Sequence, residues 1–371
     1  MHRMKSLTLR FALSCGVAIA LLSNSALAAE AARSTGRLVL VAGGGDEADG
    51  APASRAKLIS PFGVDFDQAG QMIIVEMTGH KIRKINAQGI IFTVGGNGLA
   101  GAVGDGGDAR TAQFNGIHNL AIAPNGDIYL SDTWNSRVRK IDGMTRIVTT
   151  IAGIGGKGFG GDGGLATQAQ CGNIYCVSLD SQAEDLYLAD LDNRRIRAVH
   201  LKTGIIRTIA GNGEKGVPMD GASAIASPLV DPRAVAVAKD GTVYILERSA
   251  HVLRAIEPNG RIRTVVGTGE KGASGDGGDA RRATLNGPKH LCFDLEGNVI
   301  IADTENHLVR KYLPREGRIV RLAGNGNKGT AGLGEPPEQA ELNQPHGVYV
   351  HRDGTLYISD SSNHRVLKIE R

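Results

Sequence analysis

Asn125-Gly-Asp-Ile-Tyr-Leu-Ser-Asp132-Thr-Trp-Asn135-Ser-Arg137-Val-Arg-Lys-Ile141 is the stretch of sequence that decides the fold. It contains a turn, a short apolar strand that ends in a carboxylate, a tight turn that carries Asn135, and a second alternating strand. The carboxylate recurs every 56 to 58 residues, as Glu76, Asp132, Asp190, Glu247, Asp303 and Asp360. A period of this length indicates stacked units of supersecondary structure.

Each copy of the unit contains four short apolar segments. In the second copy they lie at residues 120–122, 128–130, around 138 and at 149–151. Four short strands with apolar faces are typical of a propeller blade packed between two neighbours. The sixth copy ends after its third strand, and residues 37–41 match the missing fourth one. We therefore predict an all-β fold, a six-bladed β-propeller of four-stranded antiparallel blades over residues 37–371, whose ring is closed by the N-terminal strand.

The first 28 residues have the order of a secretory signal peptide. Basic residues come first, an apolar run follows at residues 11–22, and Ala26-Leu-Ala28 supplies small residues for cleavage after Ala28. The apolar run is too short for a membrane anchor. We expect a signal peptide at 1–28, a linker at 29–36 and an exported mature protein, periplasmic or secreted.

The charge balance gives no reason to expect a polyanionic partner. Removing residues 1–28 lowers the formal net charge from +4 to +1, because three basic residues and no acidic ones are lost. A chain so close to neutral has no electrostatic preference for nucleic acid or an anionic membrane. We expect a monomer with no integral membrane segment after signal removal, and a small molecule or a protein as its partner.

The repeat resembles a known family. Gln344-Pro-His-Gly-Val348, followed by Asp360-Ser-Ser-Asn363-His-Arg365-Val-Leu-Lys368, is similar to the NHL repeat, as are the Gly-Asp-Gly-Gly phrases that begin at Gly104, Gly161 and Gly275. The resemblance covers nearly all of residues 37–371 and implies a six-bladed propeller. It leaves the function open, because such propellers serve both as binding modules and as enzymes.

The repeated carboxylates have a structural interpretation. An Asp at a tight turn commonly accepts hydrogen bonds from backbone N–H groups. Glu76 and Glu247 are longer and lack the Asn of the turn, so they are better candidates than the four Asp to face the channel. The Gly-Asp-Gly-Gly phrases lack the spaced oxygen ligands of a calcium loop, which favours a role in backbone geometry.

One repeat position is polar or aromatic in every copy, two residues before the first apolar residue of each first strand. Its members are Phe62, His118, Tyr175, Arg233, Lys289 and His346, and the next position adds Asn119, Cys176 and His290. A core position would be apolar in each copy. Side chains of this kind around a channel mouth suit an anionic or carbonyl ligand, and two or three imidazoles could hold a divalent metal. The alternative is polar packing around channel water.

These residues support two hypotheses beside a purely structural ring. In the first, the propeller binds a small molecule or a protein at the channel mouth of its top face. Its binding residues are His118, Asn119, Tyr175, Arg233, Lys289, His290 and His346, with Glu76 and Glu247 as further candidates.

The second hypothesis is a metal-dependent lyase or hydrolase, with the metal (Zn or Ca) held in the channel by His118 and His346, and with His290 as a candidate third ligand. Tyr175 and Arg233 are then the catalytic candidates, as base or electrostatic clamp. His118, His346 and Tyr175 are similar to ligands and a tyrosine of the peptide-amidating lyase, whereas Arg233 replaces an expected histidine. The lactonase-type propellers need a Glu where this chain has Phe62.

Three cysteines follow the signal segment. Cys171 and Cys176 are close enough in sequence to form a disulfide in an oxidising compartment, or each packs as a buried thiol. Cys292 lies inside a strand and is expected to pack.

Overall fold

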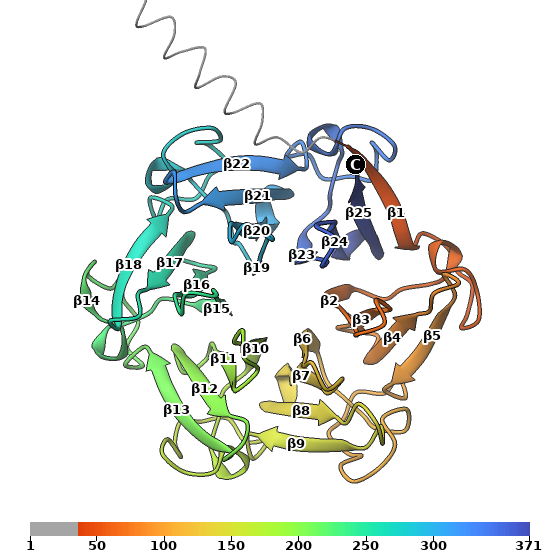
Figure 1. Ribbon diagram of the computed structural model, residues 1–371, viewed down its shortest axis with the longest axis horizontal. Helices are drawn as coiled ribbons and strands as arrows, with labels where there is room; N and C mark the ends of the chain where they lie inside the picture. Colours follow the sequence, from red (N-terminus) through yellow and green to blue (C-terminus); the bar gives the residue numbers. More distant parts are fainter. Residues whose placement is uncertain (1–35) are drawn as a thin grey trace, which may run out of the picture.

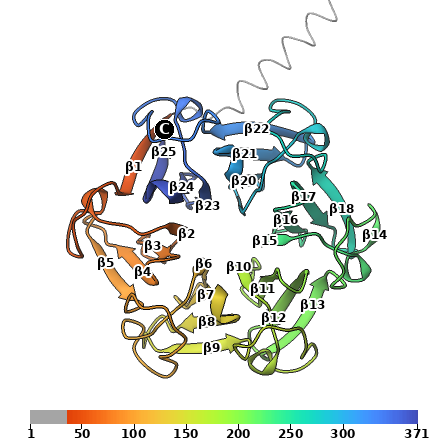
Figure 2. The same ribbon diagram turned by 180° about the vertical axis from the view of Figure 1, so that it is seen from behind.

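The computed structural model describes residues 36–371, so the expected signal peptide and almost all of the linker lie outside the described residues. Six blades stand around a common axis, with the first strand of each blade innermost (Figure 1) and the same order seen from behind (Figure 2). The predicted six-bladed propeller is therefore confirmed.

Each blade is an antiparallel sheet whose strands follow one another in sequence. Blades one to three consist of β2 (Pro61–Phe66), β3 (Met72–Glu76), β4 (Lys81–Ile85) and β5 (Ile91–Gly95); β6 (Ile117–Ile122), β7 (Ile128–Asp132), β8 (Arg137–Ile141) and β9 (Val148–Ala152); and β10 (Ile174–Leu179), β11 (Asp185–Asp190), β12 (Arg195–His200) and β13 (Ile205–Ala210).

Blades four to six repeat this plan. They consist of β15 (Pro232–Val237), β16 (Val243–Glu247), β17 (Val252–Ile256) and β18 (Arg261–Val266), with the two-residue β14 (Ala222–Ser223) added at the edge; β19 (His290–Phe293), β20 (Val299–Asp303), β21 (Leu308–Leu313) and β22 (Arg318–Ala323); and β23 (Pro345–Val350), β24 (Leu356–Asp360), β25 (Arg365–Glu370) and β1 (Arg37–Gly43).

Short 3-10 helices occupy two kinds of position. Five lie in the loops that enter a blade, namely η1 (Ala53–Arg55), η3 (Ala166–Gln168), η4 (Ala224–Ala226), η5 (Ala280–Arg282) and η7 (Pro337–Gln339). Three form the turn between the second and third strands, namely η2 (Thr133–Asn135), η6 (Thr304–Asn306) and η8 (Ser361–Asn363). No helix among residues 36–371 is long and apolar enough to cross a membrane.

The two ends of the chain share the sixth blade, as the sequence predicts. β1 pairs antiparallel with β25, with Leu38 opposite Ile369 and Arg37 opposite Glu370. Figure 1 shows β1, at the red end of the colour scale, beside the dark blue β25. Since β25 would otherwise present an open edge, this pairing removes a site for association with other chains.

The core lies between neighbouring blades. One cluster joins Val75 and Ile82 of the first blade to Leu120 and Leu130 of the second. Both faces of each sheet are covered by a neighbour, which explains why the second strand is buried at every position in β3, β16 and β20.

A buried arginine inside each blade explains the repeated carboxylates. In the second blade, Arg139 Nη1 lies 3.4 Å from Asp132 Oδ2 and Arg139 Nη2 lies 2.8 Å from Asp105 Oδ1. Asp132 also accepts the N–H of Asn115 at 2.7 Å and the side-chain amide of Asn135 at 2.8 Å. Burial raises the pKa of Asp132 to about 6, and these hydrogen bonds oppose the rise. The carboxylate therefore has the predicted structural role. The backbone N–H that it accepts belongs to Asn115 in the entering loop and not to the turn. The Asp of the Gly-Asp-Gly-Gly phrase, here Asp105, binds the buried arginine.

The cysteines form no disulfide within the described chain. Cys171, Cys176 and Cys292 are free thiols, and Cys176 Sγ lies 3.6 Å from the carbonyl oxygen of Val235. Burial raises the pKa of Cys176 to about 11. Cys171 and Cys176 therefore pack as buried thiols, the second of the two predicted alternatives.

Candidate functional site

The six side chains singled out by their repeat position line one pocket of about 330 Å³ at a channel mouth. They are Phe62, His118, Tyr175, Arg233, Lys289 and His346. Turn residues between the second and third strands, among them Trp134 and Arg248, complete the wall. The structure thus brings together residues that are spread over more than 280 positions of the chain.

A β-bulge turns five of these side chains towards the axis. The pairing of first and second strands shifts register across Phe62, between Pro61 and Val64, and the shift recurs in blades two, three, four and six. A bulge of this kind re-aims a side chain that would otherwise follow the alternation of the strand. Four of the five residues carry polar groups, which the bulge keeps out of the core, and Phe62 is the exception.

One side of the pocket is aromatic. Phe62 stacks on His346 with 4.0 Å between the ring centroids and meets the edge of His118 at 5.2 Å. His118 in turn contacts Tyr175 at 4.7 Å and Trp134 at 5.8 Å. These rings form a continuous wall from blade six through blade three.

Trp134 is a site residue that the sequence argument missed. It is the chain's one tryptophan and lies in η2. A Cβ atom on Gly116 would lie 2.5 Å from the indole, so the entering loop needs glycine there for the indole to pack over it. The signal was available, because a large aromatic residue in an exposed turn often marks a contact surface.

The opposite side of the pocket is cationic. Lys289 Nζ binds Glu305 Oε1 at 2.7 Å, and Arg248 binds Asp231 Oδ2 at 2.9 Å. Each of these two cations therefore has a carboxylate partner. The departure of the blade-four turn from the repeat was the sequence signal that could have revealed Arg248.

Arg233 differs from both of them. Its side chain is only 5% exposed, its guanidinium carbon lies 4.2 Å from the ring centroid of Tyr175, and no carboxylate of residues 36–371 pairs with it. Nη1 lies 3.5 Å from the carbonyl oxygen of Tyr175, and Nε has no hydrogen-bond partner. Burial lowers the pKa of Arg233 to about 10, so the group stays cationic at neutral pH. An unpaired buried guanidinium is costly unless an anion joins it.

The two pocket histidines are neutral and have the same tautomer. His118 Nδ1 lies 2.7 Å from the carbonyl oxygen of Gly116, and His346 Nδ1 lies 2.8 Å from that of Gln344. A carbonyl oxygen only accepts, so the proton is on Nδ1 and Nε2 carries a lone pair. Burial, together with Arg233 and Lys289, places the pKa of each imidazole well below its usual range.

Asn119 and His290 lie deeper, away from the mouth pocket. They line a separate cavity of about 270 Å³ formed by the inner strands, and Asn119 Nδ2 lies 2.9 Å from His290 Nε2. Burial lowers the pKa of His290 to about 4. His290 therefore lines a different cavity from His118 and His346. No group of three or more His, Cys, Asp or Glu side chains suited to a metal occurs in residues 36–371.

The remaining donors do not fit a metal at the mouth. His346 Nε2 already lies 3.2 Å from Lys289 Nζ, and the blade-four residue that lines the pocket is Arg233, not a third histidine. Both cations repel a divalent ion. Neither Zn nor Ca suits this set of residues.

Glu76 and Glu247 do not face the channel, which corrects the expectation drawn from their length. Glu76 Oε1 accepts the N–H of Ile59 at 2.8 Å and lies 3.3 Å from Arg83 Nη1. Glu247 binds Arg254 in the same way. Burial raises the pKa of Glu76. Both Glu side chains stay inside the blade and bind its buried arginine, as the Asp does in the other copies.

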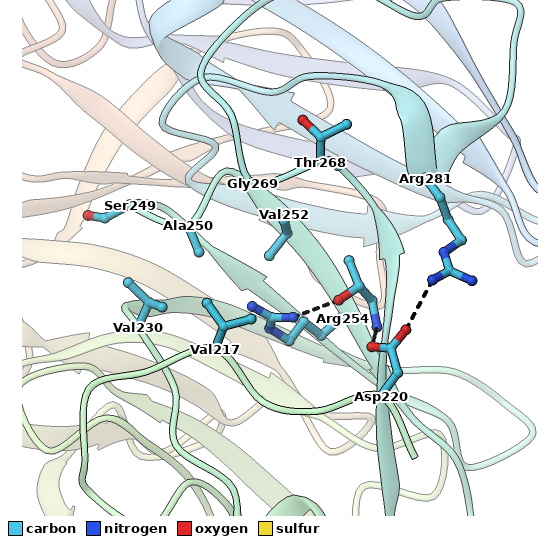
Figure 3. Close-up of a pocket in the computed structure, with 12 residues that line it drawn as sticks. Val217, Asp220, Val230, Ser249, Ala250, Val252, Arg254, Thr268, Gly269 and Arg281 are labelled. Carbon is cyan, nitrogen blue, oxygen red and sulfur yellow. Dashed lines mark hydrogen bonds and ion pairs between the residues drawn. The ribbon is translucent and has the colours of Figure 1, made fainter. Parts of the chain in front are cut away.

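A third cavity, of about 480 Å³ and called the blade-four cavity below, lies beside the blade-four turn. Figure 3 shows Ala250 and Val252 on one side and the Asp220–Arg281 ion pair, at 3.1 Å, on the other. Arg254, which also lines this cavity, is paired with Glu247. Since each of these charged groups already has a counter-charge, the cavity is electrostatically satisfied. The mouth pocket, with its unpaired Arg233, is the stronger candidate for a binding site.

The family follows from the match of individual blades. The sequence model of the NHL repeat matches residues 114–141 and 342–369, which cover the first three strands of blades two and six and the turns between them. NHL repeat-containing protein 2 of Gallus gallus is 27% identical over 342 residues, covering 83% of this chain and 46% of the relative. The chain belongs to the NHL-repeat family. A model described as the teneurin NHL domain also matches this NHL-repeat protein at residues 165–274.

Other similar proteins extend the comparison. Protein SUPPRESSOR OF QUENCHING 1, chloroplastic, of Arabidopsis thaliana is 26% identical over 275 residues, covering 71% of this chain and 26% of the relative. The NHL-repeat protein therefore spans about half or less of these curated relatives. A solved structure described as an auxiliary nutrient binding protein from Bacteroides ovatus has a TM-score of 0.67 at 16% identity, covering 90% of this chain and 76% of that one. This likeness shows the fold alone.

Proposed function

We propose that this NHL-repeat propeller binds a small organic anion in the mouth pocket, with Arg233 as the main contact. The observation that carries the proposal is the buried guanidinium of Arg233, which has no carboxylate partner within the described chain. Burying a cation without a counter-charge costs several kcal/mol. A bound carboxylate or similar anion would offset that cost through charge-assisted hydrogen bonds to the planar guanidinium.

The size of the pocket favours a small molecule over a protein. Its volume of about 330 Å³ lies within the usual range of small-molecule sites, about 300–1,000 Å³. The side chains come from rigid inner strands and short turns, so the pocket is formed before a ligand arrives. Within the protein, the charge of Arg233 is offset only by the ring and carbonyl of Tyr175 and by the electrostatic effect of Asp231, which forms no ion pair with it.

Binding of small carboxylates to the mature protein tests this proposal. Isothermal titration with benzoate should show saturable binding that the substitution Arg233→Met abolishes, because the anion loses its counter-charge. Arg281→Met removes an arginine that already pairs with Asp220 at the blade-four cavity. This substitution should leave benzoate binding unchanged. Equal binding by wild type and Arg233→Met would contradict the proposal. Thermal unfolding of both variants shows whether the fold is retained.

We further propose that the protein is exported and that its mature chain begins at Ala29. The support is the order of basic, apolar and small residues in 1–28. Mass measurement of the protein isolated from cells that express the full sequence tests it. A chain that retains residues 1–28 would contradict the proposal.

A further inference from the structure

The mouth pocket has two unlike sides, and this arrangement orients whatever it binds. Phe62, His118, Trp134, Tyr175 and His346 supply rings along blades one to three and blade six. The unpaired cation stands across from most of them in blade four. Aromatic walls favour planar rings through stacking and edge contacts. A ligand that satisfies both sides has a planar apolar body and an anionic end.

The guanidinium presents its edge to that anionic end. Arg233 lies over the ring of Tyr175, with 4.2 Å between its central carbon and the ring centroid. One face of the group is therefore covered. Nε has no partner but is enclosed, whereas Nη2 makes no hydrogen bond within the described chain and is not one of the enclosed atoms, so Nη2 remains for a ligand. Two parallel N–H groups match the two oxygens of a carboxylate.

The third feature of the pocket is His118, whose free ring nitrogen suits a hydrogen-bond donor on the ligand. His118 is only 8% exposed, and its Nδ1 proton is committed to the carbonyl oxygen of Gly116 at 2.7 Å. Nε2 is then the acceptor atom of the ring, and no hydrogen bond within the described chain reaches it. Nε2 is not one of the enclosed polar atoms, so it stays open to the pocket and can accept a hydrogen bond from a ligand. His346 Nε2 has a different situation, since it already accepts from Lys289 Nζ at 3.2 Å.

We infer that the pocket selects a hydroxylated aromatic carboxylate, whose carboxylate pairs with Arg233, whose ring lies along the aromatic wall and whose hydroxyl donates to His118 Nε2. This inference rests on the anion-binding function proposed above. It adds the ring and the hydroxyl as specific requirements, and each has its own residues.

A set of small probes tests the three requirements separately by isothermal titration with the mature protein. Benzoate carries the ring and the charge, and 3- and 4-hydroxybenzoate add the hydroxyl. Cyclohexanecarboxylate keeps the charge without aromaticity, and 4-hydroxybenzamide removes the charge. We expect at least one hydroxybenzoate to bind about 3- to 10-fold more tightly than benzoate, the range that corresponds to one net hydrogen bond. Benzoate should bind about 2- to 10-fold more tightly than cyclohexanecarboxylate, and the amide should not bind measurably.

Substitution of His118 assigns the hydroxyl preference to that residue. His118→Phe keeps a ring of similar size and removes the acceptor, so the ratio of hydroxybenzoate affinity to benzoate affinity should fall to about 1, whatever the change in benzoate affinity itself. His118→Gln retains an acceptor oxygen and should keep part of the advantage. It also serves if the phenylalanine variant does not fold.

The outcomes separate this inference from the function on which it rests. If benzoate binds in an Arg233-dependent way but the hydroxyl adds nothing, or its advantage persists in His118→Phe, the inference is overturned and anion binding stands. If cyclohexanecarboxylate binds as well as benzoate, the aromatic requirement is overturned. If no carboxylate binds at all, the proposed function fails and the inference fails with it.

Discussion

Asn119 Nδ2 lies 2.9 Å from His290 Nε2, a contact between two side chains that are 171 positions apart in the sequence. It joins the second blade to the fifth across the channel. Asn119 Oδ1 also accepts the N–H of Val177 at 2.9 Å, and His290 Nδ1 faces the N–H of Val348 at 3.3 Å. The pair thus links four blades. A neutral imidazole has one acceptor nitrogen, so His290 accepts only one of these two bonds in a given tautomer. Burial, together with Arg233, lowers the pKa of His290 and keeps the ring neutral.

This contact predicts energetic coupling across the channel. Asn119→Ala leaves the N–H of Val177 and one nitrogen of His290 without a partner, so we expect a loss of about 1–3 kcal/mol in the free energy of unfolding. The double variant with His290→Ala should lose less than the sum of the two single changes. Urea unfolding of the four proteins measures the coupling, with the exposed Gln182→Ala as a near-neutral control. Strictly additive losses would show that the two side chains do not interact.

The residue after the blade turn predicts a pH-dependent contribution to stability. His307 adopts a left-handed conformation with φ 56°, and its Nδ1 accepts the N–H of Gln344 from the next blade at 3.1 Å. Accepting this bond requires a neutral imidazole. Burial lowers the pKa of His307, with smaller effects from neighbouring charges. The stabilisation is therefore present above the unfolded-state pKa of about 6.5 and declines as the pH falls below it.

Comparison of wild type with His307→Asn tests whether this stabilisation declines as the pH falls. Asparagine tolerates the left-handed conformation and does not titrate. Wild type should be the more stable protein at pH 8, and its advantage should shrink between pH 7 and pH 5 in urea unfolding. Ser136→Asn is the matched control, because Ser136 holds the same position in blade two with φ 51°. An advantage of wild type that grows on acidification would contradict the prediction.

The buried arginines predict large losses when their carboxylates are removed. Arg310 is 0% exposed and binds Asp303 at 3.5 Å and Asp276 at 2.8 Å. Asp303→Ala leaves this charge with half of its compensation, and we expect a loss of about 3–5 kcal/mol in the free energy of unfolding. The surface pair of Arg110 with Asp108 supplies the control, since Arg110→Ala should change stability little. Similar effects of the two substitutions would rule out a special role for the buried pair.

Ring closure predicts the result of an N-terminal truncation. A chain that begins at residue 36 retains β1, whereas one that begins at residue 44 lacks it and exposes the edge of β25. We expect the longer chain to elute as a single species from size-exclusion chromatography and the shorter one to aggregate. A well-behaved, equally stable shorter chain would show that β1 is dispensable.

Metal removal should leave the propeller unchanged. The donor set of the mouth pocket does not suit a divalent ion, because Lys289 binds His346 Nε2 and Arg233 repels a cation. Dialysis against EDTA is therefore expected to alter neither the thermal midpoint nor benzoate binding. A drop in either one that zinc or calcium restores would contradict this assignment.

The sequence predicted which residues line the mouth pocket, but not which of their charges are paired. The bulge position was visible because repetition places Phe62, His118 and Arg233 at equivalent points of successive blades, and a closed ring must bring equivalent points together. The same reasoning failed for Glu76, because its partner Arg83 lies seven residues away on the adjacent strand. It also failed for Trp134, since a turn residue has no repeat pattern that shows where its side chain will rest.

The sequence by itself determined the number of blades, the closure of the ring and the face on which polar side chains gather, because a regular period with one displaced strand admits a single way to pair every edge. Only the tertiary structure decided which charges are neutralised. Lys289 and Arg248 find carboxylates while Arg233 finds none, and that difference depends on distances between separate blades. The packing of apolar faces between blades sets these distances. The sequence alone does not reveal how those faces pack.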